Sequence, residues 1–110
     1  MKVSLYSDCE PVEELEGVFR RDVLTADDGV PLVSMHILEI APKVSTPSHY
    51  HPWEHEVFVV SGTALVVGEQ GSIAIGPGNI VFIPPNEPHC FVNTGVSPIQ
   101  FVCIEPVKKK

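Results

Sequence analysis

Basic residues and long apolar stretches are both scarce in this sequence. Seven Lys and Arg stand against 14 Asp and Glu, which gives a formal net charge of −7. Binding to nucleic acid requires clustered basic side chains that neutralise phosphates, and residues 108–110 alone hold three of the seven, so we expect no nucleic-acid partner. A membrane helix needs about 18 or more consecutive apolar residues, and no stretch approaches that length. We therefore expect a soluble, cytoplasmic protein with no membrane partner.

Cysteine is also sparse and unpaired in pattern. Cys9, Cys90 and Cys103 are odd in number and show no CxxC spacing. This usage predicts neither a disulfide framework nor a zinc knuckle, and it is typical of a reducing, intracellular setting.

Stretches with the periodicity of a long helix are missing as well. In their place are short runs rich in Val, Ile and Phe, separated by Gly, Pro, Asn or Asp, as expected of strands joined by tight turns. These runs cover residues 17–24, 31–40, 55–62, 63–68, 72–76, 79–84, 89–93 and 97–106. Without helices to connect parallel strands, an all-β antiparallel barrel is the predicted architecture.

The length of 110 residues suits one hydrophobic core and leaves no room for a second domain of ordinary size. We expect an acid-rich N-terminal arm over residues 1–17, which could hold a turn of helix or an edge strand. The barrel domain is expected over residues 18–106, followed by a basic tail over residues 107–110.

Three histidines stand close together near the middle of the chain. His49 and His51 are one residue apart, so in an extended segment their side chains point to the same side. After a turn at residues 52–54, His55 begins the next strand. The spacing predicts that His55 faces the His49–His51 pair from the adjoining strand.

A fourth histidine, His89, follows a proline-rich corner at residues 84–88. Proline fixes the backbone angle φ, and Asn86 within this corner is the non-glycine residue type that best tolerates the left-handed region. Such a stiff corner gives His89 the fixed position that a metal ligand requires.

Four of the five histidines thus stand beside turns that fix them. Neutral imidazole suits several divalent transition metals. We therefore expect one ion, either Mn, Fe, Ni, Cu or Zn, on His49, His51, His55 and His89. The fifth histidine, His36, has no such pattern, and we interpret it as a core or surface residue.

These stretches resemble the two motifs of the cupin superfamily. The first motif is carried by His49, His51 and Gly62, and the second by Gly78, Pro84, His89 and Asn93. Asn86 stands where the family usually has glycine. The resemblance covers residues 17–106 and implies a double-stranded β-helix, or jelly-roll barrel, that binds a small-molecule substrate and pairs as a homodimer.

One departure from the first motif concerns the fourth ligand. Counted back from Gly62, the position that usually carries a glutamate ligand holds His55; counted forward from His51, the same position is Glu56. Only one of two neighbours on a strand can face inward. The segment resembles a subgroup of small cupins with four histidine ligands, so we favour His55 and expect Glu56 to face solvent.

Strand alternation also predicts a small, mostly apolar pocket around the ion. Its expected lining residues are Val57, Val59, Phe91, Phe101 and Cys103. Replacing a carboxylate ligand by neutral imidazole leaves a more positive centre, which is a stronger Lewis acid.

The resemblance favours a metal-dependent, dioxygenase-like oxidoreductase acting on a small oxygenated organic substrate. The more positive centre suits an alternative, an isomerase, lyase or cyclase in which the ion acts only as a Lewis acid. A non-catalytic module that binds a metal or a small ligand is the third possibility. The sequence assigns no catalytic residue.

Overall fold

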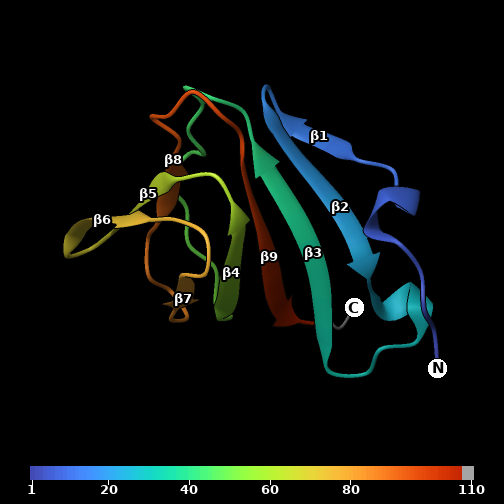
Figure 1. Ribbon diagram of the computed structural model, residues 1–110. Coiled ribbons are helices and arrows are strands. Elements are labelled where there is room, and N and C mark those ends of the chain that lie inside the picture. The colour runs from blue at the N-terminus through green and yellow to red at the C-terminus, as the bar shows by residue number, and fades with distance from the viewer. Residues whose placement is uncertain (108–110) are drawn as a thin grey trace.

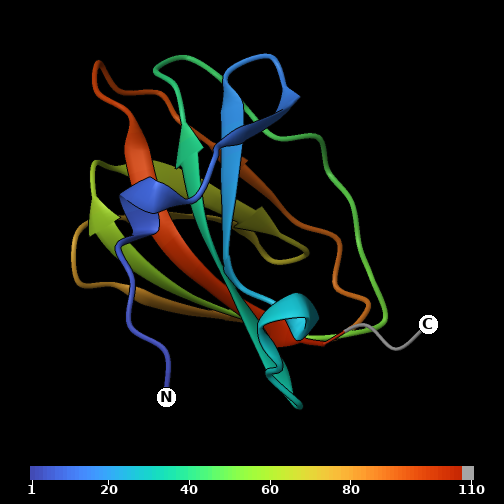
Figure 2. The same ribbon diagram turned by 90° about the vertical axis from the view of Figure 1, so that its right-hand side faces the viewer.

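The computed structural model describes residues 1–107, and its regular secondary structure is almost entirely strand (Figures 1 and 2). Every run predicted as a strand is one, with ends that differ from the prediction by at most two residues. The strands are β2 (Val18–Leu24), β3 (Val33–Ile40), β4 (His55–Ser61), β5 (Ala64–Gly68), β6 (Gly71–Ile75), β7 (Ile80–Ile83), β8 (Cys90–Val92) and β9 (Ile99–Pro106). The all-β class is therefore confirmed.

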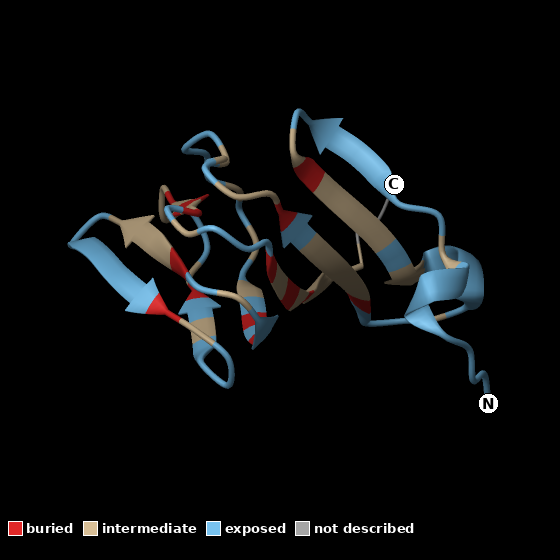
Figure 3. Cartoon of the chain, turned by 45° about the horizontal axis from the view of Figure 1, so that its top comes forward, coloured by how far each residue is buried: buried red, intermediate tan, exposed pale blue. Residues whose placement is uncertain are grey.

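The N-terminal segment contains both elements that its sequence allowed. A short 3₁₀ helix, η1 (Tyr6–Asp8), precedes the edge strand β1 (Val12–Leu15), which pairs antiparallel with β2. All four β1 residues are exposed (Figure 3). A second 3₁₀ helix, η2 (Ala26–Asp28), lies between β2 and β3. Strand pairing thus joins part of the expected arm to the barrel sheet, and all of the expected tail except Val107 lies outside the described residues.

The strands form two antiparallel sheets. One has the order β1-β2-β3-β9-β4-β7 and the other the order β6-β5-β8. In Figure 1 the long strands β2, β3 and β9 lie side by side, and β5, β6 and β8 form the opposite side of the molecule. This is the predicted jelly-roll arrangement of a double-stranded β-helix.

The core lies between the sheets and follows the alternation of side chains. On β4, Val57 and Val59 are buried whereas Phe58 is exposed, and on β9 Phe101 and Cys103 are buried. Burying apolar side chains is worth about 25 cal/mol per Å² of surface, so this inward row holds the sheets together. Figure 3 shows the buried positions gathered along the facing strands.

Asn93, the last residue of the second motif, has a structural role. It is 1% exposed, and its Nδ2 donates hydrogen bonds to the carbonyl oxygens of Ile40, Ala41 and Ser97 at 2.9–3.2 Å. Its Oδ1 accepts from the backbone N–H of Gly95. Buried backbone carbonyls need partners, so this side chain holds the corner before β9 in place.

The outer face of the six-stranded sheet carries exposed apolar side chains, among them Phe58, Ile80 and Phe82. The homodimer implied by the resemblance stays a prediction. Among the described residues, no helix is long and apolar enough to span a membrane.

Candidate metal centre

Two segments far apart in sequence bring three histidines together. The segment that follows β3 runs antiparallel to the one that precedes β8, and His49 and His89 exchange both backbone hydrogen bonds at 3.0 and 3.1 Å. The left-handed backbone predicted for Asn86 is confirmed, with φ at 66°, and its N–H donates to the carbonyl of His51 at 2.7 Å. In Figure 2 the green segment before β4 descends beside the orange segment before β8.

One ring nitrogen from each of His49, His51 and His89 lies within 4.8 Å of the others. Each Nδ1 lies 2.8–3.0 Å from a backbone carbonyl oxygen, that of Pro47 for His49, Trp53 for His51 and Glu87 for His89. A carbonyl oxygen only accepts, so each Nδ1 carries the ring proton. Each Nε2 is therefore left with a free lone pair, as a metal ligand requires.

His51 provides the sharpest test of whether these residues fit a metal ion. Its Nε2 is buried and has no hydrogen-bond partner. A buried polar atom without a partner is costly unless something binds it, and an ion at this position would satisfy it. Burial also lowers the pKa of His51 and of His89, which keeps both rings in the neutral, ligating form.

The three histidines line a pocket of about 310 Å³ between the sheets. Its apolar lining includes Leu38, Val57, Phe91 and Phe101, and the charged side chains of Glu14, Arg20 and Glu105 also line it. The rings of Phe91 and Phe101 stack with centroids 4.8 Å apart. A metal bound here would thus face a mostly apolar chamber, in which electrostatic interactions are stronger than in bulk water.

His55 lies on the inward side of β4, but its ring points to a residue absent from our sequence-based predictions. Its Nε2 is 2.7 Å from Glu105 Oε2, and its Nδ1 is 3.4 Å from Cys103 Sγ. The structure therefore brings three of the four predicted ligands together. A fourth bond, from His55, requires the ring to turn away from Glu105, and that role stays a prediction.

The His51 ring packs against two other rings. Its centroid is 4.9 Å from that of Trp53, with an interplanar angle of 6°, and 4.2 Å from that of His55. The Trp53 indole N–H also donates to Glu105 at 3.0 Å. Trp53 therefore forms part of the pocket wall and holds His51 in place.

A protein-family model described as "Cupin domain" matches residues 36–105 of the chain.

The chain belongs to the cupin family. A search of curated proteins matches mannose-1-phosphate guanylyltransferase RfbM of Salmonella typhimurium, 35% identical over 57 residues. That match covers 52% of this cupin and 12% of RfbM, so the chain spans only a small part of that relative.

Solved structures match much more of the molecule. The polyketide cyclase RemF from Streptomyces resistomycificus superposes with a TM-score of 0.91 and 32% identity, over 98% of this cupin and 80% of RemF. KdgF from Halomonas sp. superposes with a TM-score of 0.83 over 96% of this cupin and 94% of KdgF. At 15% identity, the match to KdgF shows the shared fold alone.

Four of the five predicted lining residues of this cupin are on the pocket wall: Val57, Phe91, Phe101 and Cys103. Val59 is fully buried in the core and is not among the residues that line the pocket. Alternation places a side chain on a face but does not say how far along the barrel it lies.

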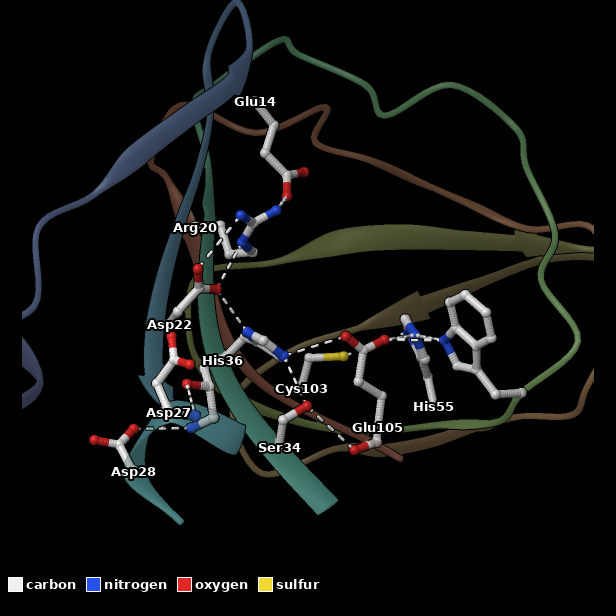
Figure 4. A network of polar contacts seen from close by, with 12 residues as sticks. Glu14, Arg20, Asp22, Asp27, Asp28, Ser34, His36, His55, Cys103 and Glu105 are labelled. Carbon is white, nitrogen blue, oxygen red and sulfur yellow. Dashed lines mark hydrogen bonds and ion pairs between the residues drawn. The ribbon is translucent and has the colours of Figure 1, made fainter. Parts of the chain in front are cut away.

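Sequence reasoning missed Glu105 and the partners of His36. Glu105 is in contact with His55, and His36 lies 3.2 Å from Glu105 and 2.7 Å from Asp22 (Figure 4). The alternation that placed Phe101 and Cys103 inward extends to Glu105, so the signal was present. For His36 the signal lay in the pairing of β3 with β9, which sequence spacing alone does not reveal.

We expect Glu56→Gln to change zinc affinity by less than about twofold, because Glu56 lies on the exposed face of β4. His55→Ala should weaken zinc binding by about 10-fold or more, as the predicted ligand or as a neighbour of His51. Competition titration with a chromophoric chelator measures both. Full affinity in His55→Ala together with a loss in Glu56→Gln would move the fourth ligand to Glu56.

Proposed function

We propose that this cupin is a metal-dependent cyclase that closes rings in a polyketide-like substrate without net oxidation. The observation that carries the proposal is the similarity to RemF, which extends over nearly the whole chain at 32% identity. The three-histidine cluster in an apolar pocket supports it. The dioxygenase-like oxidoreductase stays the second candidate, favoured by the resemblance to metal cupins.

The reaction class suits neutral ligands. A divalent ion held by His49, His51 and His89 would act as a Lewis acid toward a carbonyl oxygen of the substrate. The chain itself contributes rigid placement, because each ligand ring is fixed through Nδ1–H to its own loop backbone. Ligand rings that cannot turn keep the ion at one place in the pocket.

The apolar side chains of the pocket would hold the substrate chain in a bent conformation and shield it from bulk water. Ring closure of the aldol type joins the carbon of a CH₂ group between two carbonyls to a third carbonyl carbon. One proton of the CH₂ group ends on the oxygen of the attacked carbonyl, which becomes a hydroxyl. The second CH₂ proton then leaves with that hydroxyl as water as a carbon–carbon double bond forms, so no oxidant is needed. The stacked pair Phe91 and Phe101 offers flat surface to a planar chain, and excluding bulk water protects the reactive polyketone from hydrolysis and misfolding.

The test uses zinc-loaded protein and a synthetic poly-β-ketone thioester. We expect a cyclised product that has lost water, detected by mass spectrometry, with no oxygen consumption at an oxygen electrode. Glu56→Gln should behave as the wild type, whereas His51→Ala should lose activity. Oxygen uptake coupled to product would overturn the proposal in favour of the oxidoreductase, and tight binding without product would favour a binding module.

A further inference from the structure

The inward face of β2 changes from apolar to polar along the strand. Val18 is buried, whereas Arg20 and Asp22, which alternation places on the same face, are polar and partly exposed. Arg20 lies opposite Leu38 of β3, which belongs to the apolar lining of the pocket. Among the lining residues that the structure describes, Arg20 is the only Lys or Arg. The pocket therefore has a polar end that holds a single permanent cation.

A β-bulge brings Glu14 to Arg20 (Figure 4). The register of β1 against β2 shifts between Glu13 and Leu15, so Glu14 is the extra residue. A bulge redirects a side chain that plain alternation would place on the other face. Glu14 and Leu15 both line the pocket as a result, although they are neighbours, and Glu14 forms an ion pair with Arg20 Nη1. A local distortion of an exposed edge strand thus adds a carboxylate to the polar end.

Two carboxylates hold the Arg20 guanidinium in place. Nε donates to Asp22 Oδ1 at 2.7 Å, Nη2 donates to Asp22 Oδ2 at 3.4 Å, and Nη1 donates to Glu14. Burial acts to raise the pKa of Asp22, but hydrogen bonds from Arg20 and His36 prevail and lower it, so Asp22 is ionised. A planar guanidinium held from two sides has a fixed orientation.

The same guanidinium keeps donors for a ligand. Nη1 and Nη2 each carry a second N–H beyond the one that these contacts use. No other acceptor among residues 1–107 lies within hydrogen-bond reach of them. The Arg20 side chain is 34% exposed and lines the pocket, so these N–H groups can donate to an oxygen atom of a bound molecule.

The charge around these donors is negative overall. Glu14, Asp22 and Glu105 place three carboxylates at this end of the pocket. Against them stand the Arg20 guanidinium and the His36 ring, which can add at most one positive charge. A ligand carboxylate or phosphate would meet like charges at close range, which costs more in a mostly apolar chamber than in water. An uncharged oxygen accepts the same hydrogen bonds without that repulsion.

We propose that Arg20 is a specificity-determining residue that binds a carbonyl or ester oxygen of the substrate at the polar end of the pocket. Glu14 and Asp22 fix Arg20 and exclude substrates that carry a free carboxylate or phosphate there. That the substrate is a polyketone rests on the proposed function, and a polyketone chain held as a thioester is uncharged along its length. The choice between an uncharged and an anionic end is a property of binding and is measured without turnover.

The test compares two probes on zinc-loaded protein at pH 7 by isothermal titration calorimetry. Both are the same synthetic β-diketone on a short alkyl spacer, which ends either in a methyl ester or in a free carboxylate. We expect the wild type to bind the ester at least about 10-fold more tightly than the acid. Arg20→Lys keeps the charge but loses the fixed fork of donors, so its affinity for the ester should fall by about 10-fold. The matched control is Arg21→Lys, the same change on the opposite face of β2, where Arg21 lies over the Tyr6 ring; it should bind both probes as the wild type does.

A second variant tests the exclusion of anions. Glu14→Gln removes one carboxylate but keeps an oxygen that can accept from Arg20, so the acid should bind about 10-fold more tightly and the ester within about twofold of the wild type. Glu16→Gln, the same charge change at an exposed residue, should leave the ratio of the two affinities unchanged. Unchanged ester affinity in Arg20→Lys, or a ratio that Glu14→Gln does not alter, would overturn the proposal.

These outcomes are distinct from those of the cyclisation assay. An ester preference that depends on Arg20 and Glu14, without any cyclised product, would overturn the proposed function alone. Cyclised product together with equal wild-type affinity for the two probes would overturn the specificity role alone. Circular dichroism shows whether each variant is folded. Should Arg20→Lys fail to fold, the ratio of affinities in Glu14→Gln decides the proposal by itself.

Discussion

His51→Ala should bind zinc at least about 100-fold more weakly than the wild type, the largest effect on metal affinity expected for this chain. The wild-type ring presents a buried Nε2 without a hydrogen-bond partner, and its Nδ1–H is fixed by the carbonyl of Trp53. Alanine leaves only His49 and His89 of the three nitrogens that lie within reach of one ion. Competition with a chromophoric chelator gives the two dissociation constants.

The control lies one residue away in sequence. Tyr50 is 66% exposed and lies between His49 and His51 in sequence, so its side chain points away from theirs and Tyr50→Ala should keep the wild-type affinity. Zinc at about 100 times its dissociation constant should also stabilise the wild type by about 2.7 kcal/mol and His51→Ala far less. Wild-type affinity in His51→Ala would show that zinc binds elsewhere.

The barrel was predictable because its signals are local. Alternating burial along a strand placed Val57, Phe101 and Cys103 inward, and tight turns between apolar runs marked the strand ends. The sequence did not distinguish a helical turn from an edge strand at β1. This strand is short, acidic and exposed on every residue, so its sequence shows no alternation of apolar and polar side chains. Its place is set by pairing with β2, which is a tertiary contact.

The candidate site was predictable in its backbone but not in its side-chain contacts. Spacing and the proline-rich corner identified the three clustered histidines, because a stiff loop fixes where a side chain starts. The direction of the His55 ring depends on Glu105, which lies across the β4–β9 pairing. His36 becomes part of the same cluster only through the register of β3 against β2 and β9.

Gly62→Ala should lower the free energy of unfolding by roughly 4 kcal/mol, through two separate costs. Gly62 has φ at +80°, a conformation that disfavours any Cβ. A Cβ at this position would also lie 2.2 Å from the carbonyl oxygen of Pro98 and 2.7 Å from Cα of Ile99. Ile99 is fully buried at the start of β9, so the backbone has no room to move away.

A substitution at Gly78 distinguishes the cost of the positive φ from the cost of the steric clash. Its φ is +87°, but a Cβ there would meet nothing within 4 Å, so Gly78→Ala should lose only about 1 kcal/mol from backbone conformation. Urea denaturation followed by circular dichroism measures both variants. Equal losses would mean that the chain around Pro98 relaxes. A much larger loss at Gly62 would show that the first cupin motif keeps its glycine for close backbone approach as well as for the turn.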